Sequence, residues 1–314
     1  MNSRVHPNYK TKYSVTNWAS YDRALVRRGD VTVWLSPEAV AGWRPRRAGR
    51  PGGQFKYSDL AIQTALTLRL IYHLPLRQTE GFLTSVFGMM DVDLDVPDHT
   101  TLSRRGQRLD VKLRRVAVDE AIHLVVDSTG LAIVGKGEWA AAKHGAKSRR
   151  GWRKLHLGVD GSGAILAQVL TEGNADDART GLRLIDAVEG DLASFTADAA
   201  YDTIAIYEAA GARGATVVVP PTKTATISRS RPRSTARDRT IEKVKEVGRR
   251  RWKKEMGYHR QGRVENAFFR YKSIIGDLLR ARHPNAQKTE ASIACSILNR
   301  MFELGAPASV AVAR

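Results

Sequence analysis

The spacing of apolar residues changes along the chain, from a helical period before residue 110 to short strand-like runs after residue 120. In the first part, Ser58 or Asp59 stands where a helix cap is expected, and Asp98 precedes another helical run. The pattern therefore predicts a small helical region with helices over 58–72, over 76–87 and from Asp98 onward.

The last of these helices carries polar and basic side chains near its start: Thr100, Arg104 and Arg105. Two helices joined by a turn, with such residues on the second one, resemble a helix-turn-helix that reads DNA. Many small helical domains that do not bind DNA also end in a basic helix. The pattern favours the DNA-reading interpretation and leaves the other open.

After residue 120, short aliphatic and β-branched runs alternate with helical segments. Strands are expected over 122–127, 154–159, 163–170, 195–198 and 216–219, and helices over 177–188, 202–210 and 286–303. Three strands followed by alternating helices and strands are typical of an α/β layout with a mixed sheet. This order matches a ribonuclease-H-like fold.

A charged segment over 222–256 interrupts that order. Its first part is rich in Ser, Thr and Arg and is expected to be flexible, whereas a short helix is expected from about Thr240. Such a segment is either a solvated insertion or a grip on phosphates. The scarcity of acids among its arginines and lysines favours the second interpretation.

The charge of the whole chain points to a polyanionic partner. Among 314 residues, 51 Lys and Arg outnumber 32 Asp and Glu, for a net charge of +19. The alternative is a basic protein without such a partner. The chain has one cysteine, Cys295, and shows neither a signal peptide nor an apolar stretch long enough to span a bilayer. We therefore expect the protein to work in the cytoplasm, away from membranes.

Two further segments are basic. The segment 44–53 contains Arg46, Arg47 and Arg50 and is either a linker or an arm that enters a minor groove. A second segment, 143–154, lies between the first two expected strands. It is interpreted as a DNA-gripping loop that contains Arg149, Arg150, Trp152, Arg153 and Lys154.

Three acidic residues stand where a phosphoryl-transfer site needs them. Asp127 and Asp198 each follow an expected strand, and Glu265 lies on an expected helix. Carboxylate oxygens suit Mg²⁺, and two such ions with three carboxylates stabilise the charge that develops in phosphoryl transfer. We therefore predict two Mg²⁺ ions, replaceable by Mn²⁺, held by Asp127, Asp198 and Glu265.

The helix that carries Glu265 has one apolar stripe, made of Val264, Phe268, Tyr271, Ile275 and Leu278. Lys272 follows Glu265 by two helical turns and shares its face. A carboxylate for metal and an ammonium for a DNA phosphate are thus expected in one groove. On an arbitrary helix both residues would be ordinary surface charges.

Other acids and histidines compete for such a role. Asp177 and Asp202 are better explained as helix caps, and Asp160 before Gly161 fits a hairpin turn. Strand packing explains His156.

The chain resembles bacterial insertion-sequence transposases of the Asp-Asp-Glu type, specifically the insertion-sequence-five family and its nine-hundred-and-three subgroup. The motifs that carry the resemblance lie at 17–18, 21–25, 49–51, 57–62, 123–131, 137–139, 152–157, 197–203 and 258–272. The signature of that family around its glutamate is Tyr, two residues, Arg, three residues, Glu, six residues, Lys. Tyr258, Glu265 and Lys272 fit, but Gln261 stands at the arginine position, so Arg260 or Arg263 is expected to contact the phosphate instead.

The resemblance implies an enzyme that binds the terminal inverted repeats of its own element, nicks the 3′ ends and joins them to target DNA. It implies double-stranded DNA as partner and a dimer or larger assembly. The rivals are a stand-alone metal-dependent nuclease of the same fold and a non-catalytic DNA-binding regulator. The expected organisation is an N-terminal region with a basic arm (1–56), a helical DNA-binding domain (57–118), a catalytic domain (119–283), and a C-terminal helix with a tail (284–314).

Overall fold

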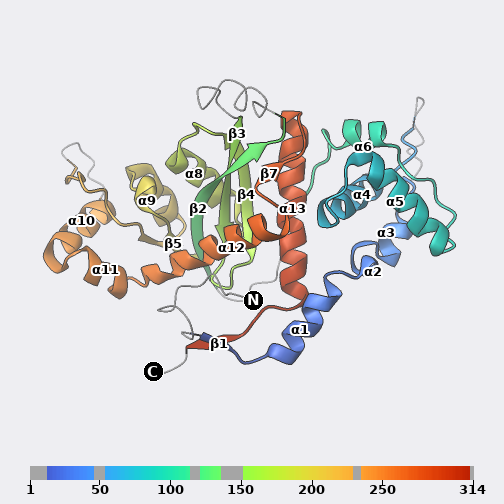
Figure 1. Ribbon diagram of the computed structural model, residues 1–314. Coiled ribbons are helices and arrows are strands. Elements are labelled where there is room, and N and C mark those ends of the chain that lie inside the picture. The colour runs from blue at the N-terminus through green and yellow to red at the C-terminus, as the bar shows by residue number, and fades with distance from the viewer. Residues whose placement is uncertain (1–12, 46–53, 114–120, 136–150, 229–234, 312–314) are drawn as a thin grey trace, which may run out of the picture.

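The computed structural model describes residues 13–45, 54–113, 121–135, 151–228 and 235–311 (Figure 1). These residues form a six-stranded mixed sheet, a two-stranded sheet and the helices around them. The elements before residue 120 are β1 (Tyr13–Val15), α1 (Trp18–Arg27), α2 (Val31–Trp34), α3 (Pro37–Ala41), α4 (Asp59–Ile71), α5 (Leu76–Met89) and α6 (His99–Arg105).

The elements after residue 120 carry the large sheet and its covering helices. The strands are β2 (Ile122–Ile133), β3 (Trp152–Val159), β4 (Ile165–Glu172), β5 (Leu192–Thr196), β6 (Thr216–Val218), β7 (Leu278–Leu279) and β8 (Ser309–Ala311). The helices are α8 (Asp177–Ala187), α9 (Ile204–Ala212), α10 (Thr235–Val247), α11 (Arg249–Glu255), α12 (Gly262–Ile274) and α13 (Pro284–Leu304), with short 3-10 helices η3 (Ala199–Tyr201) and η4 (Tyr258–Gln261). None of the helices in the described ranges is long and apolar enough to cross a membrane.

The large sheet has the strand order β4-β3-β2-β5-β6, and β7 lies beside the far end of β2. β2, β3 and β4 are antiparallel neighbours, whereas β5 and β6 run parallel to β2. The expectation that Asp127 ends its strand was wrong. β3 pairs with β2 as far as Ala132, so the strand continues, but the pairing with β5 stops at Val125. Asp127 therefore lies within β2, just past the point where its parallel neighbour ends.

Side chains alternate between the two faces of β2, and each face has its own core. Val125 and Leu131 pack in a cluster with residues of α12 and α13, whereas Leu124 and Val126 pack with residues of α8 and α9. Asp127 has the same parity as Val125 and Leu131. It therefore belongs to the face that α12 covers.

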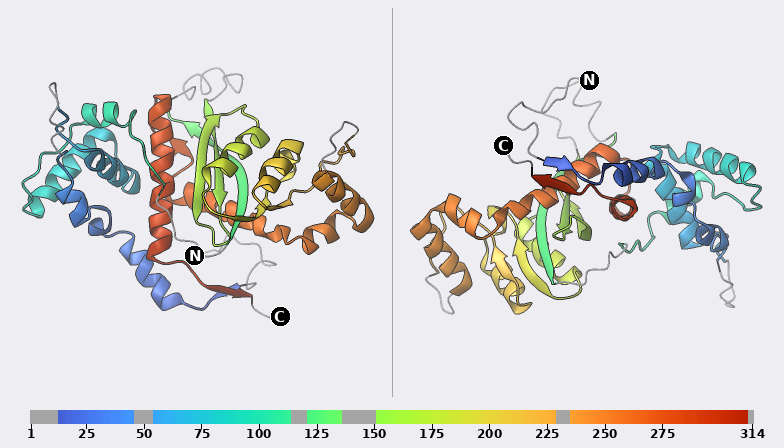
Figure 2. Two further views of the ribbon diagram at one scale, coloured as in Figure 1. Left: turned by 180° about the vertical axis from the view of Figure 1, so that it is seen from behind. Right: turned by 90° about the horizontal axis from the view of Figure 1, so that it is seen from below.

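α13 joins the helical region to the sheet. It contacts β4 on one side and α4 on the other, and Figures 1 and 2 show it standing between the sheet and the helices α4 to α6. One continuous apolar cluster includes Leu68 of α4, Leu298 of α13 and Leu157 of β3. The helix expected in a separate C-terminal unit is thus a central element. The predicted domain boundaries themselves stay predictions.

The expected caps of the helical region are confirmed. The Ser58 hydroxyl accepts a hydrogen bond from the amide of Ala61 at the start of α4. The Asp98 carboxylate accepts hydrogen bonds from the hydroxyls and the amides of Thr100 and Thr101 at the start of α6. These bonds, that of the Thr100 hydroxyl above all, hold the pKa of Asp98 well below its usual range. These caps depend only on neighbouring residues, so the sequence suffices to predict them.

In the basic insertion, α10 begins at Thr235 rather than at about Thr240, and α11 follows it. Asp202 is not the cap of α9; Thr203 is. The Asp202 carboxylate instead accepts hydrogen bonds from Arg237 Nε at 2.8 Å and Nη2 at 3.0 Å, and from the Thr222 amide at 2.9 Å. This two-pronged contact ties α10 to the turn before α9.

Replacing Asp202 with Ala should loosen the insertion. The Arg237 side chain, 13% exposed, would lose its carboxylate and remain as a buried charge, at a cost of about 3–5 kcal/mol. Urea denaturation and limited proteolysis near residues 222–240 measure the effect. Glu246→Ala, at the exposed pair with Lys243, is the control and should cost no more than about 1 kcal/mol. Equal effects of the two changes would contradict this role of Asp202.

Candidate active site

Asp127 is a half-buried carboxylate on β2 with acidic neighbours. Its Oδ1 accepts a hydrogen bond from the Ser128 amide at 2.8 Å. Burial raises the pKa of Asp127 to about 6; the bond from Ser128 opposes this, and the charges of Asp198, Glu265 and Asp177 add to it. The last effect shows that Asp198 and Glu265 lie close enough to Asp127 to change its protonation.

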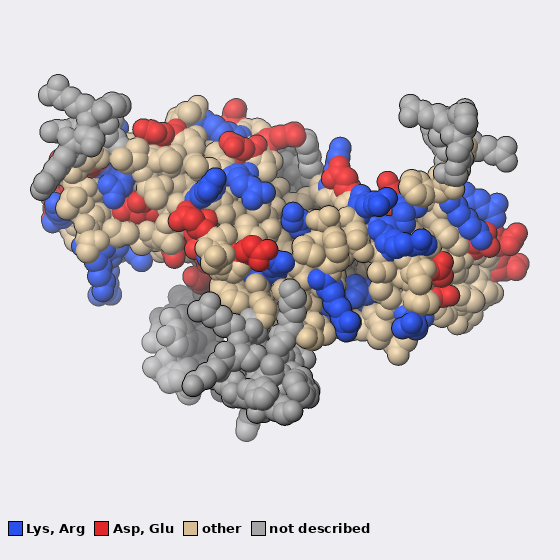
Figure 3. All heavy atoms as spheres, turned by 90° about the horizontal axis from the view of Figure 1, so that it is seen from above, with Lys and Arg blue, Asp and Glu red and all other residues tan. Residues whose placement is uncertain are grey.

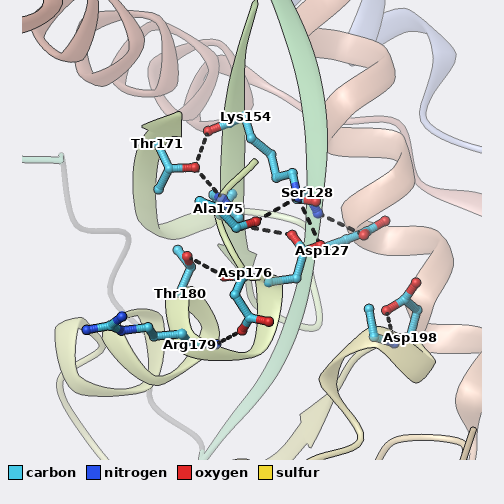
Figure 4. A network of polar contacts seen from close by, with 12 residues as sticks. Asp127, Ser128, Lys154, Thr171, Ala175, Asp176, Arg179, Thr180 and Asp198 are labelled. Carbon is cyan, nitrogen blue, oxygen red and sulfur yellow. Dashed lines mark hydrogen bonds and ion pairs between the residues drawn. The ribbon is translucent and has the colours of Figure 1, made fainter. Parts of the chain in front are cut away.

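Asp198 occupies the position expected for it, two residues past β5, the parallel neighbour of β2. It caps η3, where its Oδ1 accepts a hydrogen bond from the Ala200 amide at 2.9 Å. Figure 4 shows Asp127 on β2 and Asp198 on the segment beside it. Strand pairing and the cap together fix the backbone on which this carboxylate stands.

Glu265 lies in the first turn of α12, with an exposed side chain, and Lys272 lies exposed in the last turn of the same helix. The predicted apolar stripe is confirmed for Val264, Phe268 and Tyr271, which are buried. It does not reach Leu278. The helix ends at Ile274, and Leu278 belongs to β7, where it is largely exposed.

Gln261, which stands where the resembled family has arginine, connects η4 to β2. Its side chain is 5% exposed, and its Nε2 donates a hydrogen bond to the Val126 carbonyl at 3.2 Å. Val126 directly precedes Asp127, and Gln261 directly precedes α12. The amide therefore helps to set the distance between the strand of Asp127 and the helix of Glu265.

The three carboxylates are neighbours without forming a closed ligand set. Within the described ranges, no three His, Cys, Asp or Glu side chains are close enough together to hold a metal ion. Like charges repel when no cation lies between them, and Glu265 is free to turn because its side chain is exposed. The site therefore offers oxygen donors from three elements: two part-buried carboxylates, on β2 and after β5, and one exposed carboxylate on α12.

Comparison with known proteins identifies the family. A family model described as "Transposase DDE domain" matches residues 119–300, more than half of the chain, and includes all three carboxylates. The chain belongs to the DDE transposase family. A second model with the same description matches residues 26–136. The chain is also similar to a cryo-EM structure of the piggyBac transposase synaptic complex with hairpin DNA. The match covers 94% of this chain and 78% of that chain, at 12% identity and a TM-score of 0.38.

Of the residues that this DDE transposase is predicted to use for DNA contacts beside the carboxylates, Tyr258 is close enough for their charges to act on it. Burial raises the pKa of Tyr258 to about 12, and the charges of Asp198, Asp127 and Glu265 add to this. Arg260 Nη1 lies 3.1 Å from Nδ1 of His123 on β2, whereas the Arg263 side chain is exposed. Of the two arginines proposed to replace the role at Gln261, Arg260 is therefore held by the fold and Arg263 is available to a ligand.

The segment expected to be a DNA-gripping loop ends in strand β3, because residues 152–159 pair with β2 and β4. Arg153 is buried; it pairs with Glu172, and its Nε donates to Gln287 Oε1 at 2.9 Å. Lys154 Nζ donates to the Ala175 carbonyl at 3.0 Å. A DNA phosphate would have to displace these partners. Trp152 is exposed, and Arg149 and Arg150 lie outside the described residues.

The residues of the N-terminal part that are predicted to contact DNA differ in their exposure. Thr100 and Arg104 are exposed on α6. Arg105 turns inward, where Nη2 lies 2.6 Å from Asp59 Oδ1 and Nη1 donates to the Tyr57 carbonyl at 3.0 Å. Arg46, Arg47 and Arg50 lie outside the described residues.

Tyr201 is a residue at this site that the sequence patterns did not reveal. It ends η3, three residues after Asp198, and is 1% exposed. Its ring lies against Gly181 of α8, where a Cβ atom would come within 2.9 Å of Cδ1 and 3.0 Å of Cε1. The contact of Tyr201 with α8 holds the segment of Asp198 in place, and only a glycine at 181 leaves room for it. A glycine inside an otherwise regular helical pattern was the available signal.

Asp177 is not the cap of α8; Asp176 is, since its carboxylate accepts the Arg179 amide at 2.7 Å (Figure 4). The carboxylate of Asp177 faces β3 instead, with Oδ2 at 3.1 Å from Lys154 Nζ and Oδ1 at 3.5 Å from His156 Nδ1. Burial lowers the pKa of His156 to about 4, so the imidazole is neutral near pH 7. The expected packing role of His156 within the strand is confirmed by its complete burial.

Replacing Gly181 with Ala should disturb the site through Tyr201. The added methyl would overlap the ring and force η3 away from α8, at a cost of about 1–3 kcal/mol and with a lower transposase activity. Gly211→Ala is the control. Its Cβ meets nothing within 4 Å, and alanine favours the helix by up to about 1 kcal/mol. The role assigned to Tyr201 fails if the two variants have the same stability and activity.

Replacing Asp127 with Asn should stabilise the metal-free protein at neutral pH. The pKa of Asp127 is about 6 in the folded protein and near 3.8 in the unfolded protein, so ionisation of Asp127 lowers the stability of the fold. This loss of stability is absent below about pH 4 and complete above about pH 6. We expect a gain of about 1–2 kcal/mol at neutral pH, reduced for partial exposure, and none near pH 4. Denaturation in the presence of a chelator tests this, with the exposed Asp186→Asn as control. A gain that does not vary with pH would contradict it.

Proposed function

We propose that the chain is a DNA transposase that binds the terminal inverted repeats of its own element, cleaves the 3′ ends and joins them to target DNA. The observation that carries the proposal is the approach of Asp198 and Glu265 to Asp127 from three elements inside the matched family domain. The acids come in the chain order Asp, Asp, Glu that gives the family its name.

The proposed fold of the catalytic part is ribonuclease-H-like. Three antiparallel strands, β4, β3 and β2, followed by the parallel strands β5 and β6, support this assignment. In such a sheet the central strand β2 has neighbours on both sides. A carboxylate on it therefore has the least backbone freedom of any in the site.

The proposed cofactor is a pair of Mg²⁺ ions, with Mn²⁺ as a substitute. The donors are all carboxylate oxygens, which suit a hard cation that keeps part of its water shell. When bound, such ions polarise the phosphoryl group and lower the pKa of an attacking water. Asp127 and Asp198 would supply oxygens from fixed positions, and Glu265 would turn in from α12 to complete the set.

The proposed reaction has two displacements at phosphorus. Water attacks the phosphodiester at the end of the element; a new P–O bond forms, the bond to the 3′ oxygen breaks, and a 3′-hydroxyl is released. That hydroxyl then attacks a target phosphodiester: a P–O bond to the 3′ oxygen of the element forms, the bond from the same phosphorus to the target's 3′ oxygen breaks, and a target 3′-hydroxyl is released. The residues proposed to hold the DNA backbone nearby are Lys272, Arg263, Arg260, Tyr258 and Trp152, with Thr100 and Arg104 on α6; Arg46, Arg47, Arg50, Arg149 and Arg150 stay predictions outside the described residues.

Both ends of the element must be brought together before they are joined to target DNA. A homodimer or larger assembly on DNA is therefore part of the proposal. The proposed location is the bacterial cytoplasm, in association with the nucleoid.

Substitution of the acids tests the proposal. Asp127→Asn, Asp198→Asn and Glu265→Gln should each lower cleavage of element ends in Mg²⁺ by about 10²–10³-fold or more, because each removes a carboxylate that would hold the Mg²⁺ ions whose positive charge stabilises the transition state. Binding of end DNA in the presence of a chelator should persist, and the exposed Asp186→Asn should keep full activity. Full cleavage by all three variants would sink the assignment.

A strand-transfer assay with pre-cut ends separates the rivals. A transposase joins such ends to target DNA, whereas a stand-alone nuclease cuts intact ends and never joins them. A non-catalytic regulator would bind end DNA without either reaction.

A further inference from the structure

A cavity of about 490 Å³ lies between α4, α6 and the segment that leads from β7 into α13. Its apolar walls are formed by Leu66, Leu70, Leu102 and Ile293, and Arg69 and Arg280 line its polar side. None of the residues that line it belongs to the carboxylate site. Its volume is in the range of pockets that hold a small organic molecule.

Arg69 is a buried cation in this cavity without full compensation. The residue is 8% exposed, and its Nε has no hydrogen-bond partner. Its acidic neighbour, Glu290, stands 3.8 Å from Nη1. The Glu290 carboxylate already accepts hydrogen bonds from the amides of Arg280 and Ala281, both at 2.8 Å. A buried guanidinium with a distant, shared carboxylate is a site where an anion would gain strong hydrogen bonds.

The rim of the cavity is also cationic. It includes the exposed side chains of Arg77 and Arg282 together with His283, and Glu290 is the one acid among the lining residues given by the described part of the chain. Seen from above, Lys and Arg side chains gather over the part of the molecule that carries α6 and its neighbouring helices (Figure 3). The charge of the rim would attract an anion to the opening, and the buried Arg69 would hold it inside.

The cavity continues into the face of α6 that the sequence assigned to DNA. Leu76, Arg77 and Ser103 line both the cavity and a shallower hollow that also contains Thr100 and Arg104. A strand that crosses the exposed side of α6 would therefore pass the mouth of the cavity. The apolar walls would suit a sugar or a base, and the guanidinium would suit the phosphate attached to it.

We propose that this cavity binds one nucleotide, with its phosphate on Arg69 and its sugar or base against the leucine walls. The proposal rests on the proposed function for the source of that nucleotide, a DNA strand that lies across α6. The cavity would then be a second contact point for DNA, distinct from the carboxylate site and formed where the helical region meets α13.

The test is binding of deoxythymidine monophosphate, thymidine and inorganic phosphate to the full chain, by calorimetry in the presence of a chelator. The monophosphate should bind at least about 10-fold more tightly than either part alone, because only the intact nucleotide uses both the cation and the apolar walls. Equal binding of inorganic phosphate and the nucleotide would overturn the proposal, as would no binding of the nucleotide.

Two variants locate the binding. Arg69→Gln removes the buried charge, and Ala286→Leu fills the cavity while every charge stays; each should weaken nucleotide binding about 10-fold or more. Circular dichroism checks that both variants fold, and Ala286→Leu keeps the test valid if Arg69→Gln does not. Arg179→Gln, on α8 and directed away from Asp127 in Figure 4, is the matched control and should bind as the unmodified chain does. Unchanged binding in Ala286→Leu would overturn the proposal.

Assays on end DNA separate this proposal from the proposed function. If the chain cleaves and joins DNA but Ala286→Leu leaves the affinity for the nucleotide unchanged, the cavity assignment is wrong and the transposase proposal is supported. If the cavity binds the nucleotide as expected but the chain neither cleaves nor joins DNA, the transposase proposal fails and the cavity assignment stands.

Discussion

The placement of an ionisable carboxylate on a buried central strand is the constraint on which the rest of the site depends. Asp127 has the parity of Val125 and Leu131, two core residues, so the sheet fixes its position and removes part of its hydration. Burial is the main reason that its pKa rises, and the neighbouring acids add to it. A cation beside this carboxylate would favour its ionised form against both effects, which is why the position suits the proposed metal.

The elements around Asp127 are arranged to bring two more carboxylates to it. β5 stops pairing at Val125, which leaves room for Asp198 to stand beside the strand. Gln261 binds the carbonyl of Val126 and so connects the start of α12, with Glu265, to the same point. The Tyr201 ring packs against Gly181 of α8 and so holds the segment of Asp198 in place. Most of these contacts are made by backbone or by buried side chains, whereas the Glu265 side chain is exposed.

α13 has a second organising role, because it is the common wall of the sheet and the helical region. Its buried residues join the apolar cluster that runs from α4 to β3. On one side, Gln287 accepts from Arg153; on the other, Glu290 lies near Arg69. Both arginines are thereby taken into the interior. The difference is that Arg153 has partners at Nε and Nη1, whereas the Nε of Arg69, a residue that lines the cavity, has none.

The sequence by itself determined the properties that depend on near neighbours. The period of apolar residues located α4, α12 and α13, the caps at Ser58 and Asp98 followed from adjacent residues, and three acids in order pointed to one chemistry. Only the tertiary structure decided which charges are free. The sequence predicts Asp202 as a helix cap, but its partner is Arg237, 35 residues away. It predicts Arg153 as a DNA contact, but Arg153 donates to Gln287, 134 residues away. Local patterns fix the type of element because its hydrogen bonds are local, whereas the pairing of a charge depends on which distant segment the folded core brings beside it.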